Sequence, residues 1–194
     1  MKKLAPADLW SLERYSRDRA DFRVRVMAHK KHRQVSVGPN TMWLFEDRLT
    51  VQYQVQEMLR TERIFEVEGI ADELAAYNPL IPDGSNWKAT FLIEYTDPEI
   101  RRVQLEKLKG VEDRCWVQVA GCEKLFAIAD EDLERENEVK TSAVHFLRFE
   151  LTATMVAGLK GGAALSIGID HPNYQHRLDP ASDHVRSALL ADLD

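Results

Sequence analysis

Two histidines near the end of a basic stretch have the spacing that most directly suggests chemistry. The stretch MAHKKHR, residues 27 to 33, places His29 and His32 three residues apart. On a helix, side chains at i and i+3 share a face and can reach one ion. Glu57 and Glu62 in the next predicted helix would add carboxylate oxygens. This set predicts a divalent metal site in a metal-assisted enzyme, and the alternative is a solvated helix end.

A further histidine lies inside a predicted strand, residues 142–151. Strand alternation places His145 on the same face as Leu147 and Phe149. An imidazole on an apolar face requires a hydrogen-bond partner. We therefore expect either a core histidine with a satisfied ring, or a general base or ligand inside a binding site.

The helix that carries His29 also turns cations toward its own apolar face. Four apolar residues share one arc of the helical wheel, namely Leu12, Tyr15, Phe22 and Val26. Arg19 and Arg33 fall within the same arc, and a buried cation is costly unless it is paired or faces a cavity. We predict a pocket here that accepts an anion or a partner, with Arg60 of the next helix contributing to it.

The charge distribution points to an acidic protein partner or a small anion. Residues 14–33 hold eight Lys and Arg against two Asp, whereas the whole chain carries a net charge of −6. Such an uneven charge distribution can steer a complementary partner, although solvated helix faces would produce the same distribution. Nucleic-acid binding through the basic helix is a second alternative to the accessory role. The overall negative charge and the scarcity of aromatics among the outer cations disfavour it.

The most distinctive loop is NPLIPDGSNWK, residues 78–88. Its two prolines fix the backbone, Asp83 and Gly84 supply a turn, and Trp87 adds apolar bulk. Rigid loops with large side chains often carry recognition, so Trp87 is a candidate binding residue; the alternative is that it packs into the core.

Composition indicates a globular protein of one domain, residues 1–194. Hydrophobic residues make up 44% and charged residues 30% of the chain, which excludes disordered and membrane classes. The start lacks the apolar stretch of a secretory signal, so we expect a cytoplasmic location. The longest weakly polar stretch, residues 155–169, is too short to span a bilayer and contains Lys160.

Known cofactor motifs are missing from the sequence. It contains no GxGxxG, Walker loop, HExxH, GxSxG or CxxC, so no cofactor is specified beyond the divalent metal considered above. The two cysteines, Cys115 and Cys122, flank a predicted hairpin turn without facing each other, and we expect free thiols.

The order of predicted elements favours an α+β fold. Helices are expected over 8–33, from a cap at Asp47 or Thr50 to residue 64, and over 69–77, with a hairpin at 34–47. The second half alternates strands at 88–95, 114–120, 124–129, 142–151 and 163–169 with helices at 97–110, 130–138, 152–162 and 184–193. We predict amino-terminal helices and a short hairpin packed on a mainly antiparallel sheet of five or six strands.

Several stretches together resemble an uncharacterised bacterial family of about this length. They are VMAHKKHRQVSVGP, LFEDRLTVQYQVQEMLRTERI, YNPLIPDGSNWKATFLIEY, HFLRFEL and SIGIDHPNY, and the similarity covers nearly the whole chain. The family is a domain of unknown function and brings no catalytic residues to transfer. Its genes often lie beside those for a rubrerythrin-like protein and an iron-sulfur oxidoreductase. The resemblance therefore implies an accessory role in redox or peroxide-stress metabolism, which is an associational argument.

Overall fold

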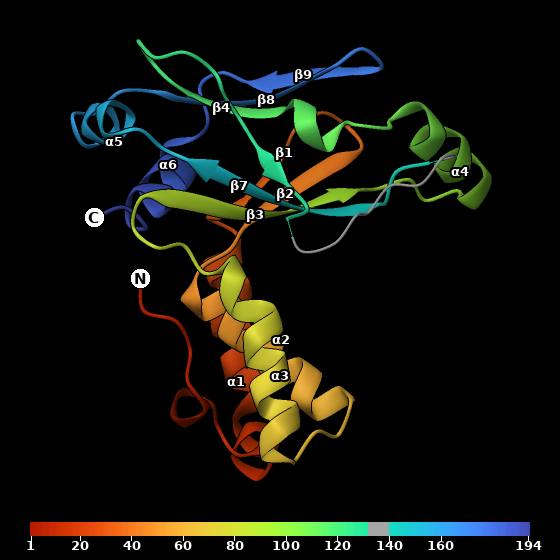
Figure 1. The fold of residues 1–194 in the computed structure, drawn as a ribbon, viewed down its shortest axis with the longest axis vertical. Coiled ribbons are helices and arrows are strands. Elements are labelled where there is room, and N and C mark those ends of the chain that lie inside the picture. Colours follow the sequence, from red (N-terminus) through yellow and green to blue (C-terminus); the bar gives the residue numbers. More distant parts are fainter. Residues whose placement is uncertain (132–139) are drawn as a thin grey trace.

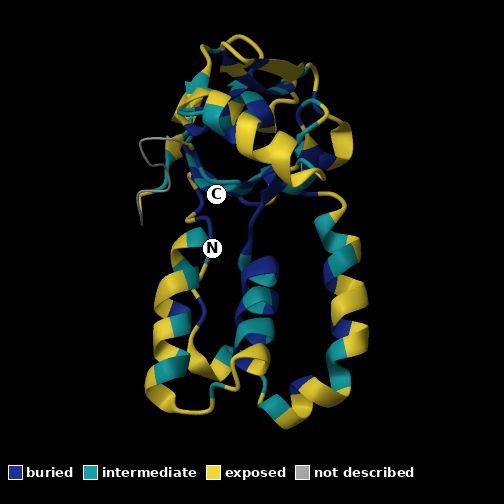
Figure 2. Cartoon of the chain, turned by 90° about the vertical axis from the view of Figure 1, so that its right-hand side faces the viewer, coloured by how far each residue is buried: buried dark blue, intermediate teal, exposed yellow. Residues whose placement is uncertain are grey.

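A helical arm projects from a pair of β-sheets (Figure 1). The computed structural model describes residues 1–131 and 140–194. The arm consists of α1 (Leu12–Lys30), α2 (Arg48–Thr61) and α3 (Val67–Tyr77). The helices lie side by side, with the most buried helix, α2, between the other two (Figure 2). Ser11 and Asp47 cap the first two helices by accepting hydrogen bonds from backbone N–H groups, as expected for such residues.

Two small apolar clusters hold the arm together. Tyr15, Phe22 and Val26 of α1 pack against Tyr53, and the opposite side of α2 packs against Leu74 of α3. Short 3-10 turns at Pro6–Asp8 and Asn78–Leu80 lead into and out of the arm. The arm therefore has apolar contacts of its own, separate from the core between the sheets.

The strands form two antiparallel sheets. The first has the order β1-β2-β3-β7-β6 and the second the order β5-β4-β8-β9. The first sheet contains β1 (Gln34–Ser36), β2 (Thr41–Phe45), β3 (Asn86–Ile93), β6 (Ile128–Ala129) and β7 (Val144–Glu150). The second contains β4 (Cys115–Val119), β5 (Leu125–Phe126), β8 (Leu165–His171) and β9 (Tyr174–Leu178).

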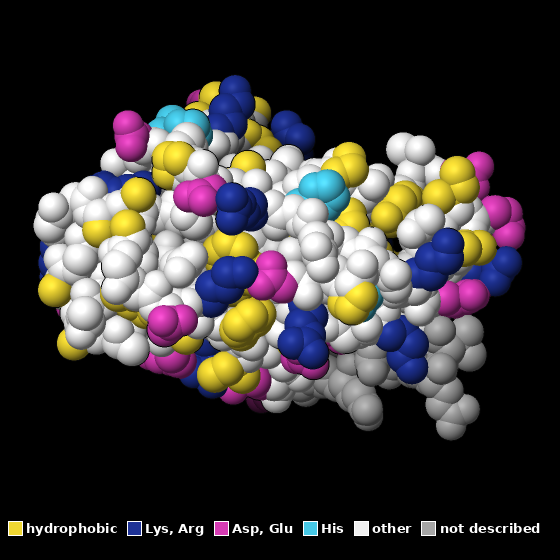
Figure 3. Space-filling view, turned by 90° about the horizontal axis from the view of Figure 1, so that it is seen from above, with side chains coloured by type: hydrophobic (Ala, Val, Ile, Leu, Met, Phe, Trp, Pro, Cys, Tyr) yellow, Lys and Arg dark blue, Asp and Glu magenta, His cyan; other side chains and the backbone are white. Residues whose placement is uncertain are grey.

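The main core contains the inner faces of both sheets. Alternate residues of β3 and β7, such as Trp87, Phe91 and Phe149, are buried, and Val117 and Ile167 belong to the same cluster from the second sheet. Three helices complete the fold: α4 (Pro98–Lys107), α5 (Ala153–Lys160) and α6 (Asp183–Leu190), with a 3-10 turn at Glu112–Arg114 before β4. Seen from the end opposite the arm, cationic and acidic side chains are interspersed (Figure 3).

The predicted α+β class with amino-terminal helices is confirmed, and the structure adds that the strands divide into two sheets. The hairpin and the Asp47 cap are confirmed as well. Strand β9 was not predicted, and most of the helix predicted at 130–138 lies outside the described residues. Cys115 and Cys122 are free, as expected. Within the described residues, no helix combines the length and apolarity needed to cross a bilayer. The single-domain and cytoplasmic assignments stay predictions.

Candidate ligand-binding cleft

A cleft lies where the arm meets the outer face of the first sheet, the face turned away from the second sheet. Tyr77 and Leu80 line it from the arm side, and Lys88, Phe146 and Arg148 line it from β3 and β7. Its volume is about 410 Å³. Pockets for small ligands have volumes of roughly 300–1,000 Å³ and combine apolar walls with a few polar groups. The cleft therefore has the size and the mixed lining of a small-molecule site.

Strand register places two cations directly opposite each other in this cleft. Lys88 of β3 pairs with Arg148 of β7, and the backbone N–H of Glu46 donates to the carbonyl oxygen of Lys88 at 2.8 Å. Glu46, Lys88 and Arg148 therefore form one row across three neighbouring chain segments. Opposed side chains in a sheet lie close together, and like charges there are destabilising. Anionic groups beside Lys88 and Arg148 would relieve this repulsion.

Protein carboxylates satisfy Arg148 but not Lys88. Arg148 donates from Nε and Nη2 to the two carboxylate oxygens of Glu131, both at 2.6 Å, and also pairs with Glu150. Within the described residues, the ammonium of Lys88 has no hydrogen bond or ion pair. Burial and the charge of Arg148 lower the pKa of Lys88 from its usual value. The half-buried Lys88 is therefore a cation without a direct carboxylate contact in the described residues, although the charges of Glu131 and Glu150 partly oppose the lowering of its pKa and Glu131 also lines the cleft.

A second compartment of about 230 Å³ lies next to the first. Both compartments share Tyr77, Leu80 and Phe146, and the second adds Lys30 of α1 and Glu46. Within the described residues, Lys30 also lacks an ion pair, and its ammonium lies 5.5 Å from the ring centre of Tyr53. Each of the two compartments thus has a lysine in its lining, and the three residues that they share include the apolar Leu80 and Phe146.

Glu46 is a buried acid in the second compartment. Its carboxyl oxygens contact the hydroxyls of Thr50 at 2.5 Å and Thr90 at 2.6 Å. Burial raises the pKa of Glu46, and this effect outweighs the lowering by both threonines and by Lys30. Thr50 Oγ1 donates to Glu46 Oε2 and Thr90 Oγ1 donates to Glu46 Oε1, so both oxygens of this buried carboxyl are hydrogen-bonded.

The structure buries Arg33 in a network rather than in a ligand pocket. Arg33 Nε donates to the carbonyl oxygen of Phe45 at 2.9 Å, and its Nη1 donates to that of Ala188 at 3.1 Å. The guanidinium also pairs with Asp192, and its side chain is only 2% exposed. The predicted inward orientation of Arg33 is therefore confirmed, but protein groups occupy its donors. An anion at Arg33 would have to displace these protein groups.

Arg19 is likewise paired inside the arm. Its Nε and Nη2 donate to the two carboxylate oxygens of Glu57, both at 2.7 Å, and the Tyr15 hydroxyl donates to the same carboxylate at 2.5 Å. The hydrogen bonds from Arg19 lower the pKa of Glu57 despite its partial burial. Arg60 is exposed on α2. Arg19 therefore joins α1 to α2, and these arginines do not form the predicted site.

The four predicted metal ligands do not meet at one point. His29 Nε2 lies 2.5 Å from Asp47 Oδ2, while Glu57 is engaged by Arg19. His32 and Glu62 are exposed, and Glu62 follows Glu57 by five residues, which separates them by about 140° around the helix. The predicted metal site at these residues is therefore not formed.

Trp87 and His145 both belong to the core. Trp87 is 1% exposed, and its indole Nε1 donates to the carbonyl oxygen of Leu189 at 2.9 Å. His145 is fully buried, with Nδ1 at 2.5 Å from Asp130 Oδ2 and Nε2 at 3.0 Å from the carbonyl oxygen of Ser142. For His145, the core alternative of the sequence prediction is the one that the structure shows.

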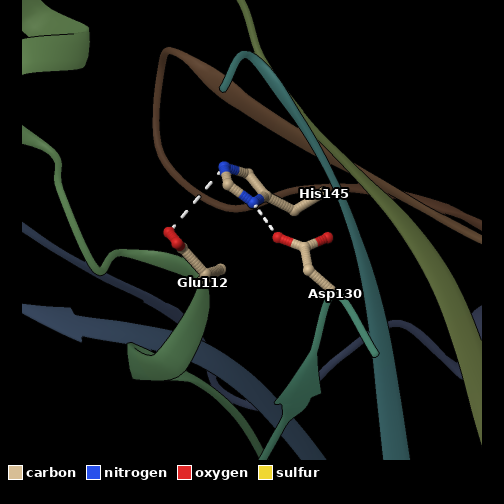
Figure 4. A group of neighbouring side chains, drawn as sticks. All are labelled: Glu112, Asp130 and His145. Carbon is tan, nitrogen blue, oxygen red and sulfur yellow. Dashed lines mark hydrogen bonds and ion pairs between the residues drawn. The ribbon is translucent and has the colours of Figure 1, made fainter. Parts of the chain in front are cut away.

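Within the described residues, Glu112, Asp130 and His145 form the one group of three or more residues with ligand atoms close enough to hold a metal ion, within 4.8 Å of one another. Figure 4 shows the two carboxylates at opposite nitrogens of the ring. The distance from Nε2 to Glu112 Oε2 is 3.7 Å. An ion bound by all three would require both carboxylates near the same nitrogen. The arrangement instead suits an imidazolium that donates from both nitrogens.

The buried ring of His145 predicts a pH-dependent stability. Burial lowers the pKa of His145, but the Asp130 hydrogen bond and the nearby negative charges outweigh it, so the pKa is raised above 6.5. Because the pKa is raised in the folded protein, the stabilisation that His145 provides is complete below the pKa of the unfolded chain. It is lost as the pH rises through the pKa of the folded protein. We expect nitrogen NMR to give His145 a titration midpoint above 6.5. A titration midpoint at or below 6.5 would contradict this reading.

Sequence reasoning missed the residues that line the cleft. Alternation did place Phe146 and Arg148 on one face of the predicted strand 142–151. The missing information was the partner strand, because only the pairing of Lys88 with Arg148 shows that two cations lie opposite each other. Lys30 lies in the basic stretch that contains the two histidines, and Glu46 lies near the end of the predicted hairpin.

The fold and the cleft define an α+β protein with two antiparallel sheets and a helical arm that forms one wall of a small-molecule site. The chain belongs to the family described as "Protein of unknown function (DUF3501)", whose model matches residues 3–193. A crystal structure of a novel protein of unknown function from Burkholderia pseudomallei K96243 is similar, with 50% identity, a TM-score of 0.94 and full coverage of both chains. No curated protein matches the chain.

Proposed function

We propose that this protein binds a small organic anion in the cleft between the arm and the first sheet. The observation that carries the proposal is the half-buried Lys88, which lies opposite Arg148 and has no counter-ion within the described residues. A ligand carboxylate would supply the missing charge through a charge-assisted hydrogen bond. Tyr77, Leu80 and Phe146 would contact its apolar body.

The lining favours a ligand with both a charged group and an apolar part. The cleft offers aromatic and aliphatic walls from Tyr77, Pro79, Leu80, Ile128 and Phe146. A compact inorganic anion would leave these walls in contact with water, whereas burying them stabilises the complex by roughly 25 cal/mol per Å² of apolar surface. An aromatic carboxylate matches both features. The predicted acidic partner and the redox-associated role stay predictions.

The test is a calorimetric titration with 4-iodobenzoate, whose ring and carboxylate match the two parts of the lining. We expect saturable binding at one site per chain, weakened by added salt because the contact is ionic. Iodobenzene, which has the ring but not the charge, is the matched control and should bind far more weakly. If neither compound bound, or if both bound equally, anion recognition in the cleft would be refuted.

A further inference from the structure

The second compartment extends the anion site toward another cation. Tyr77, Leu80 and Phe146 line both compartments, so a ligand in the first can continue past these three residues into the second. The second compartment ends at Lys30 and the hydroxyl-bonded carboxyl of Glu46. Lys88 and Lys30 thus line two neighbouring pockets that share three lining residues, and they lie on different elements.

Lys30 is placed to meet a ligand rather than a protein carboxylate. Within the part of the chain that the structure describes, it makes no ion pair, and Glu46 is the acid that lines its compartment. The oxygens of Glu46 lie against Thr50 and Thr90, and burial raises the pKa of this carboxyl. Both oxygens of Glu46 accept from these hydroxyls, and no ion pair joins the described residues Glu46 and Lys30, so the ammonium of Lys30 remains available to a ligand.

Resting on the proposed function, we infer that the ligand is an elongated organic dianion. One anionic group meets Lys88, the apolar middle passes Tyr77 and Phe146, and the second anionic group meets Lys30. Glu46 lines the pocket of the second group, and its oxygens are held by Thr50 and Thr90. Burial raises the pKa of Glu46, and a protonated carboxyl would repel the second group less than an ionised one.

The test compares straight-chain dicarboxylates, from succinate to sebacate, with monocarboxylates of the same chain length. Calorimetry at constant ionic strength gives the affinity of each. We expect one length of dicarboxylate to bind about tenfold more tightly than its monocarboxylate partner, which is the size expected for one added charge-assisted hydrogen bond. Shorter and longer dicarboxylates should lose this advantage.

Variants of Lys30 locate the second contact. Lys30→Met should reduce the best dicarboxylate to the affinity that its monocarboxylate partner shows for the same variant. Lys30→Arg, which keeps the charge, should retain part of the advantage. The exposed neighbour Lys31 provides the matched control, since Lys31→Met removes the same charge outside the cleft.

The outcomes separate the two claims. Equal affinities of mono- and dicarboxylates at every length, or an advantage that survives Lys30→Met, would overturn the dianion inference and leave anion binding intact. If no carboxylate of either series binds, the proposed function fails with it. A loss that Lys31→Met reproduces would assign the effect to general charge.

Discussion

Replacing Lys88 with Met weakens the binding of 4-iodobenzoate about 10- to 100-fold, because it removes a charge-assisted hydrogen bond worth about 1.5–3 kcal/mol. The same change leaves the protein as stable as wild type, or more stable. Lys88 lies half-buried opposite Arg148 without a counter-ion in the described structure, and its methylene stem is matched in shape by Met. Calorimetry and urea denaturation measure the two effects.

Weaker binding together with unchanged or higher stability distinguishes a binding residue from a structural one. A residue that is retained because it binds a ligand commonly lowers the stability of the ligand-free protein. Lys31→Met is the control, since Lys31 is exposed at the end of α1 and should change neither quantity. If Lys88→Met unfolded more easily while its affinity for 4-iodobenzoate stayed unchanged, Lys88 would have a structural role. The cleft would then lose its recognition group.

Replacing Arg33 with Met destabilises the protein by about 3–5 kcal/mol, the usual cost of breaking a buried ion pair by removing one partner. The substitution leaves the carbonyl oxygens of Phe45 and Ala188 without this donor, and it leaves Asp192 without its cation. Burial raises the pKa of Asp192 to about 6, despite the opposing charge of Arg33. Urea denaturation should therefore be measured at about pH 7.5, where this carboxylate is charged.

The exposed Arg23 of α1 provides the matched control for this prediction. Arg23→Met should change the free energy of unfolding by no more than about 0.5 kcal/mol, as is usual for surface positions. The double variant Arg33→Met with Asp192→Leu removes both charges and should recover part of the loss. If Arg33→Met alone behaved like the control, the buried pair would not link the amino-terminal half to α6.

Local signals in the sequence predicted most of the fold. The cap at Asp47, the hairpin around Gly38 and the first helix depend on residues close together in the chain. The cap and the hairpin are present in the structure, and the helix predicted over 8–33 is present but shorter, at Leu12–Lys30. The division into two sheets depends on pairings between distant strands, which alternation alone does not reveal.

The candidate site was harder to predict because its contacts join distant parts of the chain. The helical wheel correctly turned Arg19 and Arg33 inward, and it left open whether they were paired or faced a cavity. Glu57 and Asp192 decide this question, and Asp192 lies 159 residues from Arg33. The same limit applies to the cleft, where Lys88 and Arg148 become neighbours only through the pairing of β3 with β7.

The location of a bound anion tests the central claim most directly. A crystal soaked in 4-iodobenzoate can be measured at a wavelength where iodine scatters anomalously, so that one peak marks the ring. The account predicts this peak beside Tyr77 and Phe146, with the carboxylate within hydrogen-bonding distance of Lys88 Nζ. An iodine peak elsewhere on the protein, with the arm–sheet cleft filled only by water, would contradict it.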